Sequence, residues 1–158
     1  MVLDLGRTKV RLQFSGFKEM AEKLDKLGGD LKKTAEKALV KSKAAVTVNL
    51  VKATQKSNFP AHGKYSTGRT RHSIDTSKGV IWEGTTGFTK VGFNLYDESL
   101  YGGEGGLNFT SIFLMYGTPR MSKVQAMYDA VYGSKTKTQV RKIQKEIFAE
   151  AIKKKMEG

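Results

Sequence analysis

Apolar and polar residues alternate over residues 7–15, near the start of the chain. Val10, Leu12 and Phe14 fall on one side of this stretch, with polar side chains between them. A repeat of two residues predicts a β-strand with one buried face. Ser15 ends the alternation, and a serine at this place is expected to cap the helix that follows.

From residue 17 onward, the apolar spacing becomes that of an amphipathic helix. Its stripe comprises Phe17, Met20, Ala21, Leu24 and Leu27. Gly28 and Gly29 break this helix, and Asp30 is expected to cap a second one that runs to about Gln55. The second stripe is rich in small residues, which suits close packing on a sheet or on another subunit. It comprises Leu31, Ala35, Ala38, Leu39, Ala45, Val46, Leu50 and Ala53.

The middle of the chain alternates between loops and strand-like stretches. Residues 56–73 are polar and punctuated by proline and glycine, and they predict a loop. Residues 74–84 and 86–95 predict two strands joined by a turn. Residues 97–108 contain two Gly-Gly pairs and three acidic residues, so we expect a flexible surface loop there.

The last third of the chain predicts helices. Residues 109–116, FTSIFLMY, predict a short buried helix that Gly117 terminates. Residues 120–136 fit either a helical turn or a mobile arm. Thr136 or Thr138 is expected to cap a terminal amphipathic helix. The apolar stripe of that helix comprises Val140, Ile143, Ile147, Ala151 and Ile152.

This order of elements predicts an α+β fold, in which a small antiparallel sheet is packed by a long amphipathic helix and a C-terminal helix. A length of 158 residues suits one domain over residues 1–158. Within it, residues 97–108 and 120–136 are the expected flexible loops or arms.

The composition excludes several classes of protein. The chain lacks cysteine, so it can form neither a disulfide nor a thiolate metal site. We find no signal peptide and no long apolar run, and we expect a soluble product of the cytoplasm. The formal net charge of +13 favours phosphates and acidic protein surfaces alike. The apolar share of 39% is low, which suggests that neighbouring subunits complete the surface.

Candidate catalytic chemistry is sparse. The segment GKYS at residues 63–66 lacks the upstream glycine and the following Ser or Thr of a phosphate-binding loop. His62 and His72 are ten residues apart without a carboxylate cluster, and Ser73 and Asp75 are too generic to form a catalytic set with them. We therefore expect no enzyme activity, no metal and no cofactor.

A basic loop is the clearest binding candidate. Lys64, Arg69, Arg71 and His72 surround Tyr65 in a pattern that resembles a nucleic-acid contact. The alternatives are a solvated loop and one that pairs with an acidic partner. Without a known DNA-reading motif, any DNA binding should be independent of sequence and sensitive to salt.

Three short segments occur in an order that resembles the tail-completion, or head–tail joining, family of tailed bacteriophages. They are residues 15–39, residues 66–74 (STGRTRHSI) and residues 113–121 (FLMYGTPRM). The residues that match the family signatures are Thr67, Gly68, Arg69, Ser73, Ile74, Tyr116, Gly117 and Thr118. The chain departs from the family pattern at Thr70, where an aliphatic residue is usual, and after the Gly-Thr pair, where a proline-rich stretch is usual.

The resemblance implies a structural subunit of the phage neck, made in the bacterial cytoplasm and carried in the virion. Its partners would be copies of itself in a ring, connector or stopper, tail terminator and tail tube proteins, and packaged DNA without sequence specificity. The partner-binding residues would be the signature residues together with Arg71. Gly68 can adopt a positive φ, Thr67 can cap a short helix, and Arg69 offers a fork of donors to a neighbour. The alternative is a sequence-independent nucleic-acid-binding protein.

Overall fold

In the computed structural model of this chain, the described residues are 9–13, 18–64, 66–84, 86–97, 103, 105–107 and 109–158. The helices are α1 (Lys18–Lys26), α2 (Leu31–Ala53), α3 (Arg69–His72), α4 (Thr110–Tyr116), α5 (Gln125–Tyr132) and α6 (Ser134–Glu157), with short 3-10 turns η2 (Lys56–Asn58) and η3 (Pro60–Gly63). The strands are β1 (Lys9–Gln13), β2 (Ile81–Glu83), β3 (Thr86–Gly92), β4 (Tyr96–Asp97) and β5 (Gly106–Leu107).

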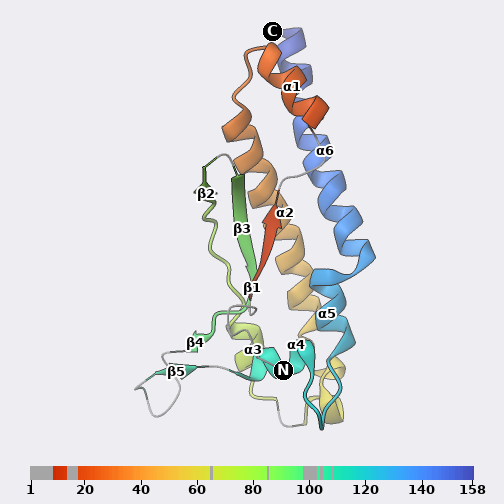
Figure 1. The fold of residues 1–158 in the computed structure, drawn as a ribbon. Coiled ribbons are helices and arrows are strands. Elements are labelled where there is room, and N and C mark those ends of the chain that lie inside the picture. Colours follow the sequence, from red (N-terminus) through yellow and green to blue (C-terminus); the bar gives the residue numbers. More distant parts are fainter. Residues whose placement is uncertain are drawn as a thin grey trace.

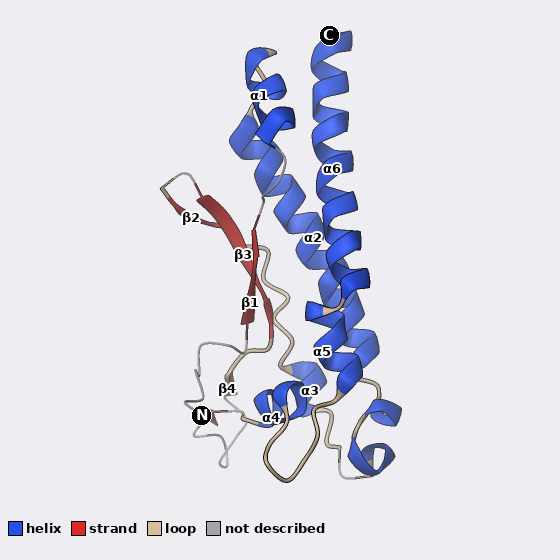
Figure 2. Ribbon diagram, turned by 45° about the vertical axis from the view of Figure 1, so that its right-hand side comes forward, coloured by secondary structure: helices blue, strands red, loops and turns tan. Residues whose placement is uncertain are grey.

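Three layers make up the body of the molecule. A three-stranded antiparallel sheet in the order β1-β3-β2 lies against α2, and α6 packs antiparallel to α2 on the side away from the sheet (Figures 1 and 2). This arrangement confirms the predicted α+β class with its long helix and C-terminal helix. None of the described helices combines the length and the apolar character needed to cross a membrane.

The sheet follows the predicted alternation of its first strand. Val10 pairs with Val91 and points toward the helices, whereas Arg11 is exposed and stacks over the ring of Phe88. The expected helix cap at residue 15 lies outside the described residues. The strand predicted over residues 74–84 is shorter than expected, because the backbone N–H of Ser77 donates to the Asp75 carboxylate and turns the chain.

Helix α2 begins as predicted. The Asp30 side chain accepts a hydrogen bond from the backbone N–H of Lys33 at 2.9 Å, and most of the expected stripe is buried. Leu31 is the main exception, with 36% of its surface exposed. It occupies the first turn, where it borders an apolar groove that Trp82 of β2 and Thr86 of β3 also line.

The structure settles the alternatives for residues 120–136 in favour of a helix, so the predicted mobile arm is wrong. Helix α5 buries Met127, Ala130 and Val131 against α2 and α6. The predicted caps of the terminal helix are also wrong, because α6 already begins at Ser134. The Thr136 hydroxyl instead donates to the Asp129 and Ala130 carbonyls.

Two clusters of buried side chains form the core. One joins α2, α4, α5 and the sheet through residues such as Leu50, Phe93 and Met127. The other joins α1, α2 and α6 around Leu24 and Phe148. Within the loop predicted over residues 97–108, the structure describes residues 97, 103 and 105–107, and Asp97 of β4 pairs there with Gly106 of β5.

Candidate functional site

Two of the three segments that carry the family resemblance, residues 66–74 and 113–121, lie at the end of the molecule opposite the C-terminus (Figure 1). The described residues of the other segment, 15–39, belong to α1 and the first part of α2, near the C-terminus. We name the end opposite the C-terminus the foot and define it as residues 56–64, 66–72 and 109–121. It contains η2, η3, α3 and α4. The loop predicted over residues 56–73 is therefore built largely from short helical turns.

Helix α3 exposes the basic side chains of the motif and buries the threonine between them. Arg69, Arg71 and His72 are exposed, and Thr70 is buried beneath them. Thr67 does not cap this helix: its N-cap is Gly68, which has a φ of 82° and no side chain to bond. The positive φ predicted for Gly68 is confirmed, and it allows the chain to enter the helical turn abruptly.

The last two residues of the first signature anchor α3 to the sheet. The Ser73 hydroxyl donates to the Thr70 carbonyl at 2.8 Å, and Ile74 forms an isolated bridge with Phe93. Both residues are buried. Ser73 and Ile74, which we predicted as partner-binding residues, therefore contact the chain itself and position α3.

A buried charge cluster that the sequence analysis set aside lies directly after Ile74. The Asp75 carboxylate accepts hydrogen bonds from Lys43 at 3.2 Å and from the backbone of Ser77 at 2.9 Å, and it pairs with Lys9 at 3.1 Å. Burial alone would raise the pKa of Asp75, but the hydrogen bonds from Ser77, Lys9 and Lys43 outweigh it and lower the pKa to about 2. The cluster ties β1, α2 and the end of α3 together.

The second signature forms a tight turn after α4. Gly117 has a φ of 79°, and a Cβ at this position would lie 2.8 Å from the Lys123 backbone nitrogen and 2.9 Å from the Met121 carbonyl oxygen. Thr118 and Met121 exchange backbone hydrogen bonds across the turn, which exposes Arg120. The sequence analysis did not single out Arg120, although it lies within the third segment of the resemblance.

Tyr116 faces the protein interior more than a partner. Its hydroxyl lies 2.7 Å from the hydroxyl of Tyr132, and its ring meets the edge of Tyr128. Its side chain is half-buried. Tyr116 therefore fixes α4 on α5 and leaves the turn beyond Gly117 as the exposed part of this signature.

A cavity of about 410 Å³ connects the first signature to α4. Thr67, Gly68 and Arg69 line one side of it, and Thr110 and Leu114 line the other. The second signature begins at Tyr116, two residues beyond Leu114, and Tyr116, Gly117 and Thr118 do not line this cavity. Both signatures thus lie at the foot, but they do not form a single pocket.

The backbone beside this cavity is strained. Ala61 and His62 have φ values of 53° and 54°, the left-handed region that favours glycine. Gly63 follows with a φ of 76°. Each non-glycine residue in this region costs about 1–2 kcal/mol, so strain is stored where the foot presents its loop.

We expect the double substitution Ala61→Gly/His62→Gly to raise the free energy of unfolding by about 1–2 kcal/mol, because glycine adopts a positive φ without strain. Denaturant unfolding followed by circular dichroism measures the change. Ala149→Gly in the exposed interior of α6 is the matched control, and it should lower stability by about 1 kcal/mol. A loss of stability in the double variant would show that the left-handed conformation is not strained.

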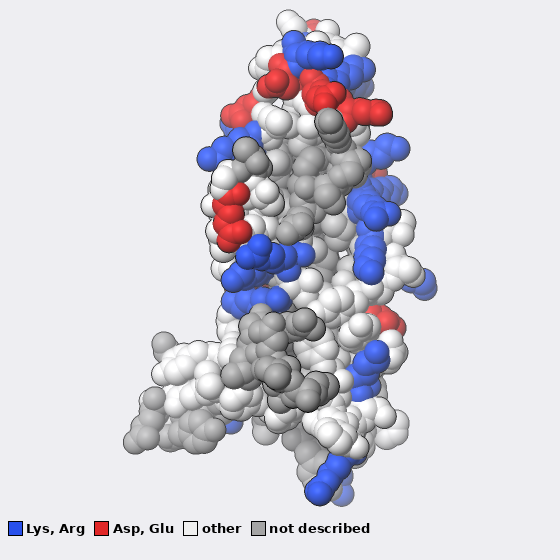
Figure 3. Space-filling view, in the orientation of Figure 1, with Lys and Arg blue, Asp and Glu red and all other residues white. Residues whose placement is uncertain are grey.

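The foot and the adjoining part of α2 carry an excess of positive charge. From Lys37 to Ile74 the sequence contains no acidic residue. Lys56, Arg69, Arg71 and Arg120 are exposed at the foot, and Figure 3 shows basic side chains at its tip. Lys64 is exposed as well, while Tyr65 lies outside the described residues. Such a surface can bind carboxylates, phosphates or backbone carbonyls through charge-assisted hydrogen bonds.

Groups for metal or acid–base chemistry do not converge on the foot. Among the described residues, there is no cluster of three or more His, Asp or Glu side chains that could hold a metal ion. His62 and His72 are both exposed.

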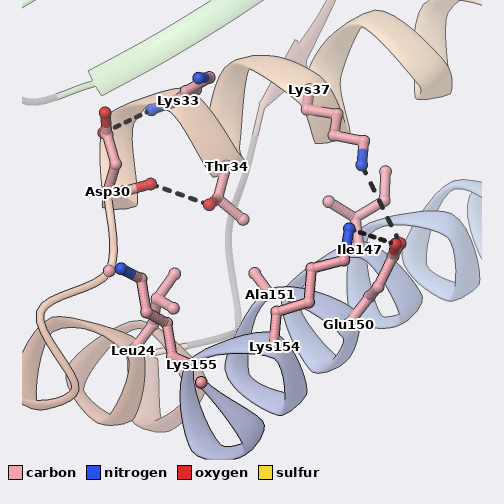
Figure 4. Close-up of a pocket in the computed structure, with 12 residues that line it drawn as sticks. Leu24, Asp30, Lys33, Thr34, Lys37, Ile147, Glu150, Ala151, Lys154 and Lys155 are labelled. Carbon is pink, nitrogen blue, oxygen red and sulfur yellow. Dashed lines mark hydrogen bonds and ion pairs between the residues drawn. The ribbon is translucent and has the colours of Figure 1, made fainter.

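A second cavity, of about 620 Å³, lies at the opposite end between α2 and α6 (Figure 4). Glu150 accepts from Lys154 at 3.0 Å and lies 4.0 Å from Lys37. The hydrogen bond from Lys154, together with the charges of Lys154 and Lys37, lowers the pKa of Glu150. Asp30 caps α2 by accepting from a backbone N–H. Both side-chain carboxylates at this cavity, Asp30 and Glu150, are therefore already engaged within the chain.

Comparison of the chain with family models, with curated proteins and with solved structures finds no match.

Proposed function

We propose that this chain is a structural subunit of the neck of a tailed bacteriophage, where it joins or completes the connection between head and tail. One observation carries the proposal: the exposed arginines of two segments that resemble the family, Arg69, Arg71 and Arg120, all belong to the foot. The underlying backbone depends on the left-handed residues Gly68 and Gly117. A surface of fixed shape and uniformly positive charge is suited to docking on an acidic neighbour.

In this proposal the protein acts by assembly in the virion and not by catalysis. Copies would form a ring around the DNA path through heterologous contacts, since cyclic symmetry closes such contacts. The foot would dock on an adjacent neck protein, which is a connector or stopper on one side or a tail terminator or tube protein on the other. Salt should weaken this docking because the foot contributes exposed cations.

The test is the double substitution Arg69→Ala/Arg71→Ala in a phage that carries this gene. Both side chains are exposed, so the subunit should remain folded. Each lost charge-assisted contact should weaken docking about tenfold or more. Electron microscopy should therefore show heads without tails, and the number of infectious particles should fall.

Lys153→Ala/Lys155→Ala is the matched control, because it removes two exposed cations at the opposite end of the molecule. It should leave joined particles at wild-type numbers. Normal joining by the Arg69→Ala/Arg71→Ala variant would overturn the assignment of the foot. Purified virions that lack the protein would overturn the proposed function itself.

A further inference from the structure

The two halves of α6 differ in charge. Residues 134–145 contain five basic residues and no acidic one, whereas residues 146–157 contain three glutamates. The basic residues of the first half are Lys135, Lys137, Arg141, Lys142 and Lys145. Figure 3 shows a column of basic side chains along the edge of the molecule where α6 runs.

Ion pairing also differs between the two halves, although Lys142 of the first half pairs with Glu146 of the second. In the second half, Lys153 pairs with Glu157 and Lys154 pairs with Glu150. In the first half, the exposed side chains of Lys137, Arg141 and Lys145 make no ion pair or side-chain hydrogen bond with any residue that the structure describes. The positive charges of Lys137, Arg141 and Lys145 are thus available to a partner outside the chain.

Lys137, Arg141 and Lys145 form one stripe, which we name the α6 stripe. Residues four apart lie on the same flank of a helix, and each step rises about 6 Å. Gln139 and Glu150, which contact Asn49 and Lys37 of α2, lie on the other flank. The α6 stripe therefore runs about 12 Å along a side of the helix that faces away from α2.

This placement works against the stability of the helix. The start of α6 has no acidic residue in its first turn and no side-chain cap, and Lys135 and Lys137 lie where the positive end of the helix dipole repels them. A sequence that breaks a local rule without a compensating contact commonly does so for function. The contact that would compensate for these positive charges is one with a negatively charged group.

We propose that the α6 stripe contacts the phosphate backbone of duplex DNA without reading its sequence. A protein partner is less suited to this surface, because protein interfaces have an apolar centre. All residues of α6 are described, and its one exposed large apolar side chain is Met156, near the other end. Protein–DNA interfaces are polar and strongly positive, and Thr138 adds an exposed hydroxyl beside the stripe.

The inference rests on the proposed function and extends it. In a ring around the DNA path, the first half of α6 would face the opening and the foot would face the neighbouring neck protein. The two surfaces then have separate partners. DNA contact belongs to the α6 stripe, and docking belongs to Arg69 and Arg71.

The test is a titration of the purified full-length protein with a fluorescent duplex of arbitrary sequence, at salt concentrations from about 50 to about 200 mM. Each phosphate contact contributes about 0.9 to the slope of log affinity against log salt. The triple variant Lys137→Gln/Arg141→Gln/Lys145→Gln should therefore lose about 2.7 from this slope. Across this range, the wild-type affinity should fall about 40-fold more than that of the variant.

Lys153→Gln/Lys154→Gln/Lys155→Gln is the matched control, because it removes the same charge from the same helix. It should keep the wild-type slope. The inference is overturned if the wild-type protein does not bind the duplex, or if both variants lose the slope equally, which would indicate net charge alone. It is also overturned if the triple variant keeps DNA binding but loses binding to poly-glutamate, which would indicate an acidic protein partner. None of these results depends on head–tail joining, which the particle assay tests separately.

Discussion

The substitution Asp75→Ala is expected to lower the free energy of unfolding by about 3–5 kcal/mol, because it leaves the buried ammonium of Lys43 without its counter-charge. Lys9 would also lose its partner, although its more exposed side chain can turn to water. The expected fall in melting temperature is roughly 10 °C. Denaturant unfolding followed by circular dichroism gives the free energy directly.

Two control variants isolate the cause. Glu146→Ala breaks an exposed pair with Lys142 and should change stability by about 0.5 kcal/mol or less. The double variant Lys43→Met/Asp75→Leu replaces both buried partners by apolar groups and should recover most of the loss. A single Asp75→Ala variant as stable as wild type would show that the cluster contributes nothing to folding.

The same cluster predicts how stability depends on pH. The pKa of Asp75 is about 2 in the folded chain, below its ordinary value of 3.8, so folding favours the ionised carboxylate. Its contribution is complete above about pH 4 and is lost as the pH falls through about 2, a change of about 2 kcal/mol. Asp75→Ala should therefore flatten the acid limb of the stability curve relative to wild type.

The consequence reaches the docking surface. Asp75 follows Ile74 directly, and its backbone N–H donates to the Gly92 carbonyl at 2.8 Å. Loss of the cluster should loosen the junction that holds α3, and with it Arg69 and Arg71. Amide hydrogen exchange at residues 70–74 should accelerate in Asp75→Ala more than exchange at α6.

Local patterns in the sequence were sufficient for much of the fold. The cap at Asp30, the end of α4 at Gly117 and the positive φ of Gly68 each depend on a few neighbouring residues, and all three predictions were confirmed. The class of fold followed from the change between two-residue and helical spacing. Short-range chemistry was enough for these features.

Features that depend on distant segments could not be predicted in the same way. Asp75 resembled an ordinary surface aspartate, since its partners are 66 and 32 residues away in β1 and α2. Ser73 and Ile74 shared a motif with Arg69, but both are buried, and Ile74 bridges to Phe93 directly after β3. The burial of α5 likewise follows from its packing on α2 and α6, and no local pattern in residues 120–136 distinguishes a packed helix from an arm.

The substitution Gly117→Ala is expected to lower the free energy of unfolding by about 2–4 kcal/mol. The backbone at this position combines a φ of 79° with a ψ of 177°, a conformation that is almost exclusive to glycine and costs other residues about 1–3 kcal/mol. The added Cβ would also collide with two backbone atoms of the turn, and neither atom can move like the end of a side chain.

Gly28→Ala separates these two causes, because Gly28 has a φ of 72° but open space around its Cβ position. It should cost about 1–2 kcal/mol from strain alone. The excess loss in Gly117→Ala measures the collision, and equal losses in the two variants would contradict it. Because Gly117 holds the turn that presents Arg120, a phage with Gly117→Ala should also join fewer tails, at temperatures where the Gly28→Ala phage joins them normally.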